Sequence, residues 1–200
     1  MIGPRHIRWR WRVAFCVVLP IFPTVGGGCV AHGSRLEVVD FSEEGSPHHY
    51  AEDFDEAYYD IDPQGNLDLI LRRVQRERMS GKPDVTQIVH VQSVWKSIPG
   101  QTIAHDDQIN ATVTYAVMVA STGHTFEGAG SVFFRSHKGT SVLTGSLGRA
   151  VVKPTRRNSP TRPLFSKAEL SGRFRAMRDA QKVKTIKNDL RRVFGPHPVG

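Results

Sequence analysis

Cysteine is scarce in this 200-residue chain, which contains only Cys16 and Cys29. Cys16 lies in an apolar stretch near the N-terminus, so a mature domain that begins at Cys29 has no second thiol for an internal disulfide. The paired cysteine ligands of a structural zinc site are lacking for the same reason. The sequence therefore excludes a disulfide scaffold and a cysteine-rich zinc module.

Long hydrophobic runs are lacking as well. The apolar run 13–22 is broken at Pro20 and followed by Pro23, whereas a membrane-spanning helix needs ~20 apolar residues. We therefore expect no permanent transmembrane helix.

Acidic residues are absent from the first 28 residues, which have the three-part plan of a secretion signal. A basic start is followed by the apolar run, and small residues then precede Cys29. The basic start carries Arg5, Arg8, Arg10 and Arg12. Subtracting these four charges from the formal +8 leaves a mature chain near +4, an ordinary value that indicates no particular partner.

The end of this leader, Val25-Gly26-Gly27-Gly28-Cys29, resembles the lipobox of bacterial lipoproteins. In that family small residues precede a cysteine that is acylated and becomes the new N-terminus. The resemblance covers the leader alone. It implies lipidation of Cys29 and a membrane-anchored position in the bacterial cell envelope, facing the periplasm or the exterior. Cleavage after Ala31, which would release a soluble secreted protein, is the alternative.

Basic residues are missing from 37–62, where ten acids occur. A segment with charge of one sign is typical of a solvated linker. We therefore predict an acidic flexible tether over 29–55, although the sequence LEVVDF within it could form a short strand. A single β-rich domain is expected over 56–195.

Strict alternation of apolar and polar residues is clearest over 108–119 and predicts a half-buried strand. Its inner face should carry Ile109, Ala111, Val113, Tyr115, Val117 and Val119. Weaker alternation covers 67–74, 85–95, 126–134, 141–152 and 170–176. Short polar links between these segments favour antiparallel neighbours. We predict a mainly β fold, an antiparallel meander of six or seven strands that forms a sandwich or a partly open barrel.

A single amphipathic helix is expected at 179–194. Asp179 can cap its start, apolar residues follow at spacings of three and four, and Gly195 with Pro196 ends it. Its apolar stripe should pack on the sheet.

Carboxylates at Asp60, Asp62 and Asp68 surround Gly65 in an order that resembles the first part of a calcium loop. Calcium takes six to eight oxygen ligands. The position where an EF-hand has its bidentate glutamate is Leu71, however, and β alternation flanks the segment. A polar hairpin turn is the preferred interpretation, and no metal or other cofactor is expected.

Linear catalytic motifs are lacking: there is no nucleophile elbow and no glycine-rich phosphate loop. The residues that could serve a hydrolase with a loop-built site are His105, Asp106 and His124, because a histidine near a carboxylate can act as a general base. We expect instead a non-catalytic binding or scaffolding module.

Acids are rare over 135–192, where sixteen lysines and arginines stand against three acids. The segment 153–163 is predicted to be an exposed loop that could bind an anionic envelope polymer or a lipid surface through Arg156, Arg157 and Arg162. A solvated basic face is the simpler interpretation. An exported chain does not meet nucleic acid, and the remaining expected partners are the membrane, through Cys29, and another envelope protein. No small-molecule ligand can be identified from the sequence.

Overall fold

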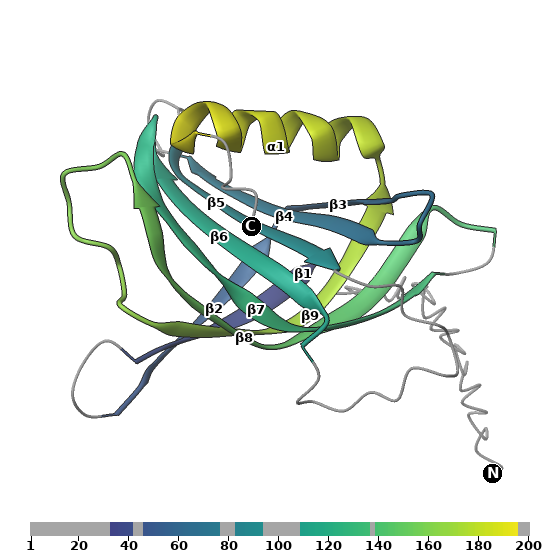
Figure 1. Cartoon of the computed structure of the whole chain (residues 1–200), viewed down its shortest axis with the longest axis horizontal. Helices are drawn as coiled ribbons and strands as arrows, with labels where there is room; N and C mark the ends of the chain where they lie inside the picture. The colour runs from purple at the N-terminus through teal and green to yellow at the C-terminus, as the bar shows by residue number, and fades with distance from the viewer. Residues whose placement is uncertain (1–32, 42–45, 77–82, 94–108, 137–138, 196–200) are drawn as a thin grey trace, which may run out of the picture. The chain divides into compact units, whose positions relative to one another are not determined.

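Alternating apolar residues organise most of the chain into strands (Figure 1). The computed structural model describes residues 33–41, 46–76, 83–93, 109–136 and 139–195. The elements of this part are β1 (Ser34–Asp40), β2 (His48–Phe54), β3 (Glu56–Ile61), β4 (Leu67–Arg76), β5 (Pro83–Ser93), β6 (Ala111–Val119), β7 (Thr122–Ser136), β8 (Val142–Arg157), β9 (Ala168–Arg178) and α1 (Ala180–Phe194).

The strands close into a seven-stranded barrel. Strands β3 to β8 follow one another as an antiparallel meander, and β9 pairs with β8 along one edge. The other edge of β9 pairs with β1 and, through Tyr58 and Tyr59 in parallel register, with β3. The ring therefore runs from β3 to β9, with β1 and β2 as additional strands. The predicted fold class, mainly β with one C-terminal helix, is confirmed.

The barrel interior is the main apolar core, built from the inward residues of each strand. In β6 these are Ala111, Val113, Tyr115 and Val117, as the alternation predicts. Two residues are exceptions to the prediction: Ile109 lies before the strand and is 65% exposed, and Val119 at the end of the strand is 54% exposed.

Helix α1 packs on the outside of the barrel, over β4, β5 and β6 (Figure 1). Its buried residues Val183, Ile186 and Leu190 contact outward residues of these strands, among them Ile70 and Ile88. The Asp179 side chain accepts a hydrogen bond from Lys182 N at 2.9 Å and so caps the helix as predicted. No helix in the described part of the chain has the length and apolarity needed to cross a membrane.

The predicted tether over 29–55 is wrong for most of its length, because β1 and β2 form an antiparallel hairpin in the sheet. β1 lies between β2 and β9, and its inward residues Leu36 and Val38 are buried in the core. Among the described acids of this segment, Glu37 and Asp53 are exposed, and Glu52 forms an ion pair with Arg73 of β4. The folded unit accordingly starts near Ser34 rather than at 56.

Candidate functional site

One end of the barrel contains a cavity of about 260 Å³. It is lined by Val38, Asp40, Tyr50, Glu52, Gln87, Tyr115, Leu164 and Phe165. These residues come from β1, β2, β5, β6 and the loop 158–167 between β8 and β9, which lies at this end of the barrel (Figure 1). Apolar cavities with a few converging polar groups are the usual sites of small ligands, especially in barrel mouths.

Aromatic rings form one wall of the cavity. Phe165 is buried and stacks on Tyr115, with ring centroids 6.1 Å apart and an angle of 5° between the planes. Phe165 also packs on Phe126 at 4.1 Å. The loop that carries Phe165 is fastened at its start, where Asn158 Nδ2 donates to Ser121 O at 2.9 Å. Barrel and loop together therefore give the wall a fixed shape.

The polar side chains that line the cavity differ in whether they have a hydrogen-bond or ion-pair partner. Glu52 is held by Arg73, but the side-chain oxygen of Gln87 is buried and has no hydrogen-bond partner among the described residues. Burial raises the pKa of the Tyr115 hydroxyl well above its usual value, despite the opposing charge of Arg73. Tyr115 thus stays protonated at any physiological pH. The cavity presents an unused acceptor, a neutral hydroxyl and apolar rings, which suits a small ligand with an apolar body and a hydrogen-bond donor.

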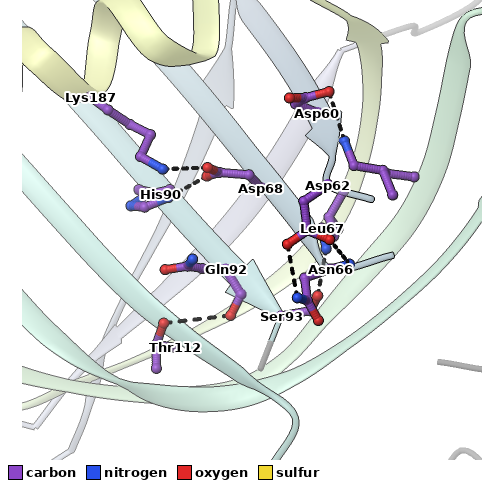
Figure 2. Close-up of polar contacts among 11 residues, drawn as sticks. Asp60, Asp62, Asn66, Leu67, Asp68, His90, Gln92, Ser93, Thr112 and Lys187 are labelled. Atoms are coloured by element: carbon purple, nitrogen blue, oxygen red, sulfur yellow. Dashed lines mark hydrogen bonds and ion pairs between the residues drawn. The ribbon is translucent and has the colours of Figure 1, made fainter. Parts of the chain in front are cut away.

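The calcium-like segment is the turn between β3 and β4, and its carboxylates do not converge (Figure 2). Asp62 accepts hydrogen bonds from Asn66 N at 2.8 Å and from Asn66 Nδ2 at 2.9 Å, and these bonds lower the pKa of its carboxyl. Asp60 Oδ1 accepts from Ile61 N at 2.9 Å. Within the described ranges no group of three or more potential metal ligands occurs. These contacts are those of a polar hairpin turn.

Asp68 belongs to a different cluster, on the outer face of the barrel beneath α1 (Figure 2). Its Oδ1 lies 2.5 Å from His90 Nε2, and its Oδ2 accepts from Lys187 Nζ of α1. Burial would raise the pKa of Asp68, but the hydrogen bonds and charges of His90 and Lys187 outweigh burial and hold it below 3.8. The cluster joins β4, β5 and α1, and these polar contacts attach the helix to the outside of the barrel.

His124 is buried at an inward position opposite Val117, close to the cavity end. Its Nε2 hydrogen-bonds with Thr161 Oγ1 at 3.1 Å, while its Nδ1 has no partner among the described residues. A nucleophile–base pair needs an acceptor at that second nitrogen to orient the ring. The other candidates, His105 and Asp106, lie outside the described residues, so a hydrolase site that combines the three stays a prediction.

The basic segment 153–163 is only partly a loop, since β8 continues to Arg157. Arg156 is mostly buried and supports the helix end: its Nη1 donates to Gly195 O at 3.1 Å, and its Nη2 lies 3.9 Å from Glu127 Oε1. Arg157 and Arg162 are exposed. Arg156 therefore has partners within the fold, and the anion site at Arg156, Arg157 and Arg162 stays a prediction.

Sequence reasoning missed the cavity because its lining residues are scattered from Val38 to Phe165 and share no motif. The one available signal was Gln87, a polar residue at an inward position of the alternating segment 85–95. Cys29 and the rest of the predicted leader lie outside the described residues. No family model matches the sequence, and the searches of curated proteins and of solved structures found no similar protein.

Proposed function

We propose that this protein is a non-catalytic binding module of the bacterial cell envelope, anchored by lipid on Cys29, and that its ligand occupies the barrel cavity. The observation that carries the proposal is the buried oxygen of Gln87, which has no hydrogen-bond partner in the described part of the chain and lies in a cavity walled by Tyr115 and Phe165. A buried acceptor without a partner costs stability, and a ligand that donates a hydrogen bond recovers that cost. The ligand class is a small molecule with an aromatic or other apolar body and an N–H or O–H donor.

A dye of this chemistry tests the cavity. N-phenyl-1-naphthylamine is neutral and aromatic and has one N–H donor, and its fluorescence rises in apolar surroundings. We expect saturable binding to the mature protein. Gln87→Met should weaken dye binding about fivefold, because one hydrogen bond contributes ~1 kcal/mol. The same substitution should leave the free energy of unfolding unchanged or higher, since it removes an unsatisfied polar group.

A matched pair of exposed leucine and isoleucine positions gives the control. Leu164→Glu adds a negative charge at the mouth of the cavity. Ile109→Glu adds the same charge at an equally exposed position just before β6, which does not line the cavity. Only Leu164→Glu should weaken dye binding. Equal effects of the two variants, or no saturable binding at all, would refute the cavity as the site.

The anchor is tested separately by the intact mass of the protein from its native host. Acylation of Cys29 predicts a mature chain that starts at this residue and carries the added mass of diacylglycerol or of three acyl chains. Several acyl chains anchor a protein firmly to a membrane, whereas a single acyl chain anchors it only marginally. A chain that starts after Ala31 without added mass would show that the protein is secreted, and would leave the cavity result unaffected.

A further inference from the structure

Four arginines occupy two neighbouring cross-strand rows on the outer face of the barrel. In the first row Arg35 of β1 pairs with Arg173 of β9. In the second, Arg175 of β9 lies beside Thr144 of β8, which pairs with Arg135 of β7. Since residues two apart on a strand point to the same side, Arg173 and Arg175 share this side. We call Arg35, Arg135, Arg173 and Arg175 the arginine face.

The charges of this face are available for a partner. Arg135, Arg173 and Arg175 are exposed and form no ion pair with any described residue. Arg35 lies 3.7 Å from Asp53, but both side chains are largely exposed and such a contact is weak. The half-exposed apolar side chain of Met177 follows two residues after Arg175. Cations beside an apolar residue are the composition of surfaces that lie on membranes.

The arginine face adjoins the point where the chain enters the barrel. The Ser34 hydroxyl bonds both backbone groups of Arg175: Arg175 N donates to it at 3.1 Å, and it donates to Arg175 O at 3.3 Å. Cys29 precedes Ser34 by five residues, which span at most ~18 Å when fully extended. With the predicted tether replaced by β1, an acyl chain on Cys29 would hold this side of the barrel within that distance of the bilayer.

We propose that the arginine face lies on the anionic lipid headgroups of the membrane. The inference rests on the proposed anchoring at Cys29. Each arginine near an anionic surface strengthens binding about fivefold at moderate salt. A broad groove of about 480 Å³ gives headgroup phosphates room beside the guanidinium groups of Arg35 and Arg173, although the carboxylate of Glu37 also lines it. β1 runs from Ser34 to the cavity residues Val38 and Asp40, and Tyr50 of β2 lines both this groove and the cavity.

Vesicle binding tests this surface without the acyl chains. The probe is the mature chain with Cys29→Ser, mixed with vesicles that contain phosphatidylglycerol or with vesicles of phosphatidylcholine alone. We expect sedimentation with the anionic vesicles only, and release at high salt. Replacing Arg135, Arg173 and Arg175 by alanine should weaken binding about a hundredfold.

The control removes the same charge from another surface, through Lys184→Ala, Arg191→Ala and Arg192→Ala on α1, where all three residues are exposed. This variant should keep most of the vesicle binding. Equal losses in both triple variants would show that net charge alone acts, and no binding of the parent chain to anionic vesicles would refute the surface. Either result leaves the mass measurement on Cys29 as an independent test of the anchor.

Discussion

At the scale of single residues, Asp68 connects three elements, although the sequence around it resembles a polar turn. It accepts from His90 on β5 and from Lys187 on α1. Asp68→Asn keeps the shape but removes the charge, and we expect it to lower the free energy of unfolding by about 1–3 kcal/mol. Urea unfolding measures the change. Asp55→Asn, at an exposed bend, is the control and should change stability by less than ~0.5 kcal/mol.

The effect of Asp68→Asn should depend on pH. His90 and Lys187 outweigh burial and lower the pKa of the folded carboxyl below 3.8. A lowered pKa in the folded state means that the ionised group stabilises the fold above the unfolded value, and that this contribution is lost as pH falls through the folded value. The stability difference between wild type and variant should therefore shrink below about pH 4. A difference that persists undiminished into strong acid would contradict the role of the charge.

Gly172 is the second residue with a clear test. Its φ is 152°, and a Cβ there would lie 2.3 Å from Arg35 O and 2.8 Å from Leu36 Cα. Gly172→Ala should therefore strain the backbone and push β1 from β9, at a cost of at least about 2 kcal/mol. Thermal unfolding measures it. Gly33→Ala, where no atom lies within 4 Å, should be neutral, and a neutral result at Gly172 would disprove the close approach of β1.

At the scale of elements, the apolar contact between helix α1 and the barrel is one narrow stripe, which adds to the polar contacts of Lys187 with Asp68 and of Arg156 with Gly195. Ile186 is 6% exposed and lies against the outward residues of β4 to β6. Ile186→Ala should lower the free energy of unfolding by about 2–4 kcal/mol, measured by denaturant titration. Thr185→Ala, on the exposed side of the same turn, should have little effect, and similar losses in both variants would argue against docking through the stripe.

Hydrogen exchange distinguishes a strand from a tether in the N-terminal segment. β1 hydrogen-bonds on both sides, to β2 and to β9, so its amides should exchange as slowly as those of β9. Mass spectrometry of peptides that cover 34–40 measures this rate. Complete exchange within seconds would restore the tether interpretation.

The elements that could be predicted from sequence are those with local periodicity. The alternation over 67–74 and 108–119 and the spacing in 179–194 each match an observed element, because one side of each faces an apolar core. The hairpin of β1 and β2 escaped prediction because its inward set includes Asp40 and Glu52, and an inward carboxylate is stable only with a partner such as Arg73. That partner is supplied by β4, which the local sequence does not reveal.

At the scale of the whole molecule, the cavity and the arginine face arise only when distant strands pair. Tyr115 and Phe165 meet through the barrel, and Arg35 reaches Arg173 through the pairing of β1 with β9. Neither set is contiguous in sequence, so composition showed the excess of basic residues over 135–192 but could not show which of them share a surface. Register, and not residue content, decides which charges share a surface.

The position of β9 has a consequence for how the protein folds. This late strand pairs with β8, β3 and β1, and the contact between Ser34 and Arg175 spans 141 positions. Contacts between residues so far apart in the sequence slow folding, because the chain loses the entropy of closing a long loop before the contact stabilises the fold. The barrel cannot close until residues 168–178, which form β9, are free to pair with both β8 and β3. Under the export proposed above, the barrel would therefore stay open during translocation and close only after β9 had crossed the membrane.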